Sequence, residues 1–178
     1  MSVIINGSAG VTTNSGAVYN GLQTDTAKVS TSGTSVDFTS IPSWVKRITV
    51  MLSGVSTNGT SIRQIQLGDS GGVETTSYVA MVSNVQTTSN TTRGVTATTG
   101  FILSHAGAAT DVLNGAVSFS LLGSNIWVAS GNLYESGSGG LNSVSGTKTL
   151  SDTLDRVRIT TVNGTDTFDA GTINIIYE

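Results

Sequence analysis

The stretch LDRVRITTVNGTDTFDAGTINIIYE, residues 154–178, decides the fold of this chain, because apolar and polar side chains alternate in both of its halves. In the first half, Val157 and Ile159 alternate with arginine and threonine. In the second half, the apolar face carries Ile173, Ile175 and Tyr177. A period of two is typical of a half-buried β-strand, and the Asn163-Gly164 pair between the halves tolerates the positive φ of a tight turn. The stretch therefore predicts a strand, a turn and a second strand.

Further strand-like segments precede this stretch: several alternate in the same way, residues 73–82 alternate incompletely but are β-rich, and residues 99–104 are a short apolar run. Further strands are expected at residues 44–54, 61–68, 73–82, 99–104, 115–122 and 125–134. Turn signals occur at Asn58-Gly59, Gly71-Gly72, Asn114-Gly115, Gly139-Gly140 and Asn163-Gly164. No helical periodicity is sustained anywhere in the sequence. Short strands with turns at this spacing predict an all-β protein, an antiparallel β-sandwich of jelly-roll-like type.

The composition supports a β-rich fold with an uncharged surface. Charged residues are 11% of the chain, whereas 25 serines and 28 threonines make up about three residues in ten; about 25% charged residues is typical of soluble domains. The net charge of −3 provides no basic field for nucleic acid or an anionic membrane. We therefore expect no nucleic-acid partner and no membrane insertion, and the N-terminus lacks the basic region of a secretory signal. Without cysteine, disulfides and thiolate chemistry are excluded.

The segment GDSGG, residues 68–72, resembles the sequence around the nucleophilic serine of trypsin-like proteases. Such a serine needs a base within hydrogen-bond reach and a carboxylate that orients the base, and those enzymes place histidine and aspartate before the serine. The single histidine, His105, follows Ser70, and the three lysines lie in segments with no matching motif. A turn between two strands explains the same letters, because glycine supplies the backbone freedom. We expect Ser70 to lie in a turn and to carry no chemistry.

Other polar side chains offer only weak candidates for a catalytic or metal site. Asp152 and Asp155 could be paired carboxylates, but the sequence favours their interpretation as residues of a turn and a strand start. Asp166 and Asp169 lack the ligand-rich spacing of a known calcium loop. His105 has no second histidine and no cysteine to complete a transition-metal site. We therefore expect no catalytic, no cofactor-binding and no metal-binding residue, and no cofactor.

The basic and aromatic residues each allow two interpretations. Polar faces of predicted strands carry Lys46, Arg47, Arg156 and Arg158. These residues would form a basic stripe if the strands were neighbours, and would otherwise pair with acidic residues across strands. Trp44 and Trp127 are expected in the core or at its rim, with stacking on a sugar ring as the functional alternative. Asn-X-Ser/Thr sequons, expected to mark turns, occur at Asn6, Asn58, Asn90 and Asn163.

The first 34 residues differ from the rest of the chain. They are polar, rich in glycine and too poor in large apolar side chains to form a core of their own. We expect residues 1–34 to form an N-terminal arm, extended or with a short strand pair. Such an arm is either flexible or ordered by lying against another chain. A β-sandwich domain over residues 35–178 follows it.

From about Val36 to Glu178, the chain resembles a recurrent C-terminal domain of tailed-bacteriophage virion proteins, met most often at the end of tail-fibre-like polypeptides. The segments that carry the resemblance are IPSWVKRITVMLSGVSTNGTS (41–61), IQLG (65–68), ETTSYV (74–79), TGFIL (99–103), NIWVASG (125–131) and, above all, residues 154–178. The resemblance implies a structural virion part, commonly a homotrimer, that is exposed on the particle exterior. The N-terminal arm is not part of it.

The expected function is therefore that of a non-enzymatic virion structural protein of the tail-fibre or baseplate type. It would be made in the host cytoplasm, be assembled on the exterior of the virion, and use its arm to hold other copies and neighbouring capsid or tail proteins. Two alternatives are a capsid decoration (cement) protein and a module that recognises a glycan of the host surface. A glycan hydrolase would need two well-placed carboxylates, and the 11 acidic residues show no such pair in the sequence.

Overall fold

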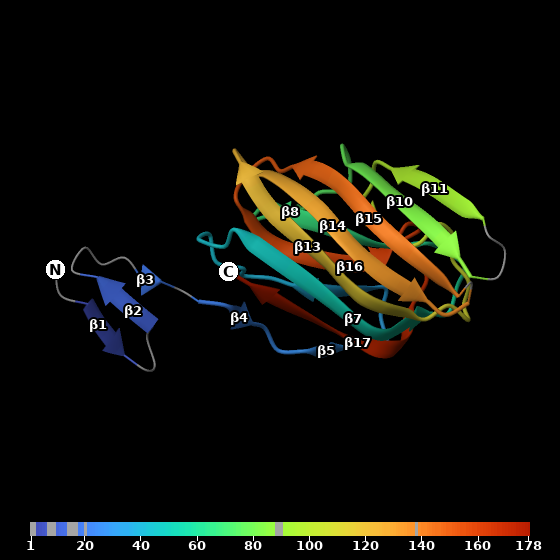
Figure 1. Ribbon diagram of the computed structural model, residues 1–178, viewed down its shortest axis with the longest axis horizontal. Coiled ribbons are helices and arrows are strands. Elements are labelled where there is room, and N and C mark those ends of the chain that lie inside the picture. The colour runs from blue at the N-terminus through green and yellow to red at the C-terminus, as the bar shows by residue number, and fades with distance from the viewer. Residues whose placement is uncertain (1–2, 7–9, 14–17, 20, 88–90, 138) are drawn as a thin grey trace.

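The computed structural model describes residues 3–6, 10–13, 18–19, 21–87, 91–137 and 139–178. These residues form antiparallel β-sheets and contain no helix, as the sequence predicted. Two sheets pack against each other as a β-sandwich (Figure 1). Within the described ranges, there is no helix long and apolar enough to cross a membrane.

The larger sheet has nine strands in the order β11-β10-β15-β14-β13-β7-β17-β4, and β5 also pairs with β17. Its strands are β4 (Gln23–Thr24), β5 (Lys28–Val29), β7 (Arg47–Thr57), β10 (Val79–Gln86), β11 (Thr92–Ala97), β13 (Leu113–Gly123), β14 (Ile126–Glu135), β15 (Gly140–Thr149) and β17 (Phe168–Tyr177). Long antiparallel ladders join the central strands, so that each outward-facing row of side chains runs across several strands.

The smaller sheet has five strands in the order β12-β8-β16-β6, with β9 paired to β8. Its strands are β6 (Ser35–Phe38), β8 (Arg63–Asp69), β9 (Gly72–Val73), β12 (Phe101–Ile102) and β16 (Leu154–Thr161). The chain changes sheet at most of its connections: β6, β8, β12 and β16 alternate with strands of the larger sheet. A third sheet, β1 (Val3–Asn6), β2 (Gly10–Thr13) and β3 (Val18–Tyr19), shares no strand with the other two.

The core lies between the two sheets and is built from the alternating positions that the sequence marked. In β7, Ile48 and Val50 are fully buried, and in β13, Val117 and Phe119 are as well. The stretch 154–178 contributes one strand to each sheet, since β16 belongs to the smaller sheet and β17 to the larger. Its two apolar faces meet the common core, where Val157, Ile159, Ile173 and Ile175 are all buried.

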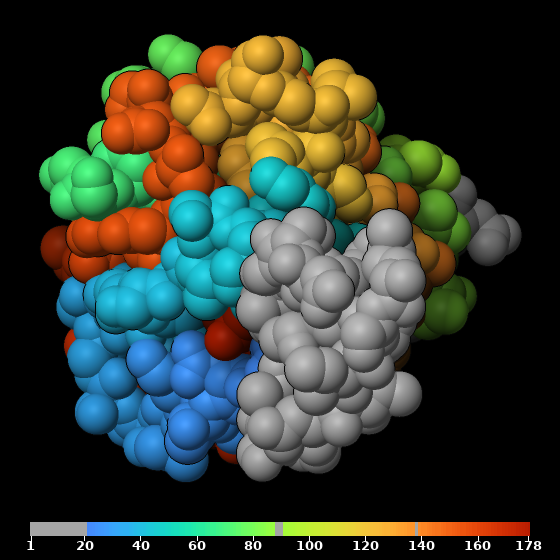
Figure 2. Space-filling model, turned by 90° about the vertical axis from the view of Figure 1, so that its left-hand side faces the viewer, coloured from blue at the N-terminus to red at the C-terminus, as the bar shows by residue number. Residues whose placement is uncertain are grey.

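Residues 21–34 lie along the outer edge of β17, although the sequence placed them in the arm. Thr24 pairs with Ile176, and the amide of Ser30 donates to the carbonyl of Gly171 at 2.9 Å. The Ser30 hydroxyl is buried and donates to the carbonyl of Ala170 at 2.8 Å. Figure 2 shows the C-terminal residues between this segment and the chain that leads into β7. The segment thereby covers an edge that would otherwise expose unpaired backbone groups.

Four of the five turn signals mark connections between strands, with Gly72 and Gly140 as the first residues of the strands that follow, and one was wrong. Asn114-Gly115 lies inside β13, where Gly115 has φ of +138° and the register with β7 shifts. An Asn-Gly pair accommodates a strand irregularity for the same reason that it suits a turn, namely its tolerance of positive φ. The β13–β14 hairpin instead turns at Ser124 and Asn125, whose φ values are 48° and 61°. Two successive positive values are those of a type I′ turn.

Replacing Phe119 by alanine should lower the free energy of unfolding by about 3–5 kcal/mol, because a fully buried ring is lost and a cavity remains. Urea denaturation followed by circular dichroism measures the change. The matched control is Ser120→Ala, which alters the next, exposed residue of the same strand and should change the value by less than about 0.5 kcal/mol. Equal effects of both substitutions would contradict this placement of the core.

Candidate functional site

Ser70 lies in the turn between β8 and β9, as the sequence predicted for GDSGG, and its side chain is exposed. The neighbouring Asp69 holds this turn. Its carboxylate accepts a hydrogen bond from the amide of Gly71 at 2.8 Å and another from the hydroxyl of Ser151 at 2.5 Å. The hydrogen bond from Ser151, followed by that from Gly71, lowers the pKa of Asp69 below its ordinary value. The polar groups around Ser70 therefore serve the turn.

The four aspartates that the sequence singled out each have a separate structural partner. Asp155 forms an ion pair with Arg156, while Asp152 accepts a hydrogen bond from the amide of Thr153 at 2.7 Å. Asp166 accepts from the amide of Ser61 and from the side chain of Asn163, and Asp169 accepts from the hydroxyl of Ser56. Among the described residues, no group of three or more histidines, aspartates and glutamates could hold a metal ion.

The remaining candidates from the sequence lie in the core, at its rim or in turns. Trp127 is buried in the core, and the ring of Trp44 lies 6.0 Å from that of Tyr177 at the rim. His105 is half-buried in the loop after β12. The sequons at Asn58 and Asn163 lie in turns. Asn90 lies outside the described residues, and of Asn6 only the backbone, in β1, is described.

The basic stripe that the sequence allowed does not form, because β7 and β16 belong to different sheets. Arg47 pairs with Glu178, and Arg156 pairs with Asp155. Arg158 forms a bidentate pair with Asp37, the arrangement described below. Pairing with an acidic residue across strands is therefore confirmed for Arg47 and Arg158, whereas Arg156 pairs with the preceding residue of its own strand.

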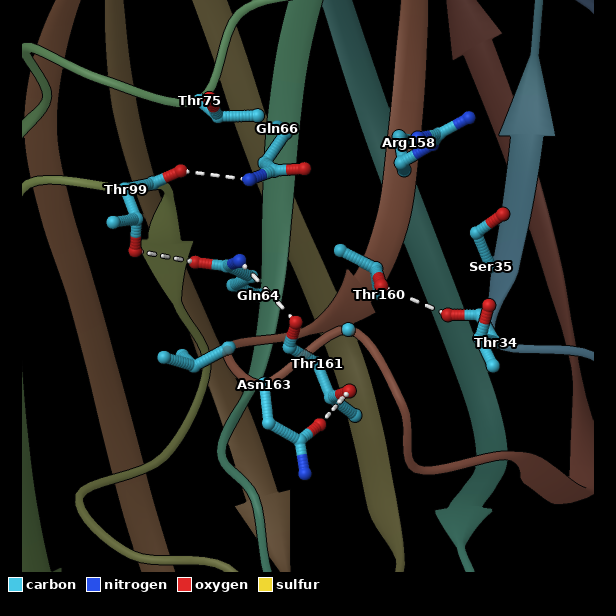
Figure 3. Close-up of a pocket in the computed structure, with 12 residues that line it drawn as sticks. Thr34, Ser35, Gln64, Gln66, Thr75, Thr99, Arg158, Thr160, Thr161 and Asn163 are labelled. Carbon is cyan, nitrogen blue, oxygen red and sulfur yellow. Dashed lines mark hydrogen bonds between the residues drawn. The ribbon is translucent and has the colours of Figure 1, made fainter.

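A polar pocket on the outer face of the smaller sheet is the candidate site (Figure 3). Its volume is about 370 Å³. The floor comes from β8 and β16, and the walls come from the start of β6, from the loops at Thr75 and Thr99, and from the turn after β16. Hydroxyl and amide side chains dominate the lining, and the one charged lining residue is Arg158.

Two glutamines of β8 project into this pocket because they alternate with core residues of the same strand. Ile65 and Leu67 point into the core, so that Gln64 and Gln66 must point outward. Gln64 uses both ends of its amide, donating to the carbonyl of Thr161 at 3.4 Å and accepting from the hydroxyl of Thr99 at 3.1 Å. Gln66 donates to the carbonyl of Thr99 at 2.8 Å.

Arg158 stands directly opposite Gln66 in the ladder between β16 and β8. Its Nε and Nη2 donate to the two carboxylate oxygens of Asp37 at 2.7 and 2.9 Å. Hydrogen bonding to Asp37 raises the pKa of Arg158 above its ordinary value. A bidentate pair of this kind fixes the plane of the guanidinium group, and it cancels the one charge of the pocket.

Sequence reasoning missed both glutamines, since no motif marks them, although the period-two pattern of residues 61–68 already placed them on one face.

Sequence reasoning also missed a buried ion pair at one end of the sandwich. Arg63 is fully buried, its Nη2 lies 3.6 Å from Oε1 of Glu135, and its Nη1 donates to the carbonyl of Ala108 at 3.4 Å. Burial lowers the pKa of Arg63, and the charge of Glu135 opposes that shift. Both side chains of this pair lie in the buried interior.

Comparisons with known proteins give no family for this chain. No family model matches it, and neither a curated protein nor a solved structure matches it. The pocket must therefore be interpreted from its own chemistry.

Acid should weaken the fold partly through the turn at Asp69. The pKa of Asp69 is lower in the folded state than in the unfolded state, where it is about 4. Its contribution to the free energy of unfolding is therefore fully present above the unfolded-state pKa and is lost as the pH falls through the folded-state pKa. Urea titrations at pH 7 and at pH 3 should show that Asp69→Asn loses stability at pH 7 and loses less than the unmodified protein on acidification. The control Ser70→Ala should behave like the unmodified protein at both pH values. A larger effect of Ser70→Ala at either pH would contradict the role of Asp69.

Proposed function

We propose that this chain is a non-enzymatic structural protein on the exterior of a bacteriophage particle, of the tail-fibre or baseplate type. It assembles through its N-terminal segment with other copies of itself, as a homotrimer, and with neighbouring virion proteins. The resemblance of residues 36–178 to domains of tailed-phage virion proteins supports this proposal. The interpretation of GDSGG as a turn is consistent with it, because the residues around Ser70 are used for structure.

The arrangement of the N-terminal segment carries the proposal. β4 and β5 fasten residues 23–29 to β17, while β1, β2 and β3 form a separate three-stranded sheet (Figure 1). A sheet of three short strands gains stability when an apolar face is packed against another element. A neighbouring chain supplies such a cover, so the segment suits attachment to another protein. Its connection through β4 and β5 would transmit that attachment to the sandwich.

The same arrangement suits a capsid decoration protein, which also needs one point of attachment and one exposed domain. A location on the tail and a location on the capsid differ in the partner protein that the N-terminal segment would bind. Sedimentation of the purified protein with emptied capsids and, separately, with purified tails distinguishes them. Binding to tails alone supports the tail-fibre or baseplate type, and binding to capsids alone supports decoration.

Removal of residues 1–20 should abolish binding to the particle and leave the sandwich folded, because the deletion spares β4 and β5. Cosedimentation with particles that lack the native protein measures binding, and thermal unfolding measures the fold. We expect the melting temperature to change by less than about 2 °C, the shift expected from about 0.5 kcal/mol.

The control is a longer deletion, of residues 1–34. It should lower the melting temperature as well, since it uncovers the edge of β17 and removes the buried side chain of Ser30. Particle binding that survives removal of residues 1–20 would refute attachment through the N-terminal segment.

A second candidate function, recognition of a glycan on the host surface, is favoured by one observation. The pocket on the smaller sheet is lined by hydroxyl and amide groups and carries no net charge once Arg158 is paired with Asp37. Sugar hydroxyls are both donors and acceptors and match such a lining. Binding of the isolated protein to a glycan array, with no particle present, tests this function.

A further inference from the structure

We propose that the pocket of Figure 3 binds one uncharged sugar residue, whose neighbouring hydroxyl groups lie between Oε1 of Gln66 and Nη1 of Arg158. The inference rests on the second candidate function, glycan recognition, and is independent of attachment through the N-terminal segment. It names the two atoms that select the ligand and the chemical class that they select.

The acceptor of the proposed site is the amide oxygen of Gln66. The residue is only 5% exposed, and its Nε2 donates to the carbonyl of Thr99 at 2.8 Å. A carbonyl can only accept, so the nitrogen must face Thr99 and the oxygen must take the opposite direction. Figure 3 shows that oxygen on the side where Arg158 lies. None of the hydrogen bonds found among the described residues uses Oε1 of Gln66, which leaves an oriented acceptor, on a largely buried residue, directed toward the side of the pocket where Arg158 lies.

The donor of the proposed site is Arg158, the direct cross-strand neighbour of Gln66. Its Nε and Nη2 are held by the two oxygens of Asp37, so the guanidinium plane is fixed before any ligand arrives. Among the described residues, no hydrogen bond from Nη1 to another protein group is found. Side-chain exposure of 38% lets a ligand reach it. A fixed donor therefore lies on the residue directly across the ladder from the fixed acceptor.

The charge of the pocket selects the class of ligand. An anion would be attracted by Arg158 but opposed by the carboxylate of Asp37 and by the amide oxygen of Gln66. A cation would meet the guanidinium group. An uncharged ligand with adjacent hydroxyls meets neither penalty, because one hydroxyl donates to Oε1 of Gln66 while its neighbour accepts from Nη1 of Arg158. The remaining lining includes the hydroxyls of Thr75 and Thr160 and the apolar side chain of Val162.

The size and the location of the pocket agree with one sugar ring. Its volume of about 370 Å³ lies at the small end of the usual range of ligand sites, about 300–1,000 Å³. Neither tryptophan lines it, so the site lacks an aromatic platform for stacking. Binding of a single ring should therefore be weak, with Kd on the order of 1 mM or above, and an immobilised polysaccharide would be held by many copies at once.

Nuclear magnetic resonance titration of the full chain tests the proposal. The probes are the methyl glycosides of glucose, galactose and mannose, with glucuronic acid and glucosamine as charged counterparts. At least one neutral glycoside should shift the backbone or side-chain amide signals of Gln66, Thr99 and Arg158 in a saturable manner, and the charged sugars should bind at least tenfold more weakly. Gln66→Met, which removes the acceptor and keeps the chain length, should weaken binding at least tenfold.

The matched control is Gln23→Met, which changes an exposed glutamine of β4 on the other sheet and should leave the affinity unchanged. Three results would overturn the proposal: no saturable shift with any neutral probe, unchanged affinity of Gln66→Met, or equal or tighter binding of a charged sugar. If Gln66→Met does not fold, the shifts mapped on the unmodified protein decide alone. A chain without residues 1–20 should still bind the sugar, so that failure of the attachment proposal and failure of this one give different results.

Discussion

Packing of alternate side chains between the two sheets is the constraint on which the rest of this structure depends. Once Ile65, Leu67, Val157 and Ile159 are buried on the inner face, the residues between them must face outward. That geometry presents Gln66 and Arg158 side by side on the outer face of the smaller sheet, because they face each other in the ladder. The pocket therefore takes its rigidity from the core beneath it, since its floor is formed by strands and not by loops.

The interior also contains polar groups, and some of them hydrogen-bond to one another or to the backbone. Lys148 is buried, donates to the carbonyl of Thr76 at 2.9 Å and lies 5.1 Å from the centre of the Tyr78 ring. Asn84 and Asn142 are fully buried and joined by a hydrogen bond of 2.9 Å across β10 and β15. A buried polar group without a partner costs about 1–3 kcal/mol, so such pairs favour one strand register over its neighbours. These polar pairs take the place of apolar contacts in strands that are rich in serine and carry few apolar side chains.

Sequence patterns predicted the strands whose inner face is apolar and failed where it is not. Ile48 and Val50 marked β7 clearly. β15 was not predicted from the sequence. Its inward side chains include Asn142 and Lys148 beside Val144, so apolar and polar residues do not alternate along it. The pairing of residues 21–30 with β17 joins positions about 150 apart in the chain, and no local signal indicates such a contact. No sequence pattern indicated Gln66, for a different reason. Its proposed role depends on the direction of its side-chain amide, and only the hydrogen bond to Thr99 in the structure fixes that direction.

Attachment and ligand recognition would use different parts of this fold, and the topology keeps them compatible. Residues 23–29, which join the proposed attachment segment to the sandwich, pair with β17 of the larger sheet, whereas the pocket lies on the outer face of the smaller sheet. The link between them is the short chain from Ser30 to Ser35, where the carbonyl of Thr34 accepts a hydrogen bond from the hydroxyl of Thr160 at 2.8 Å. This contact anchors the wall of the pocket to β16, the strand that also carries Arg158. A force applied to the N-terminal segment would therefore act first on its contacts with β17, including that of Ser30. The donor Arg158 and the acceptor Gln66 would stay in place, because they are held by Asp37 and Thr99.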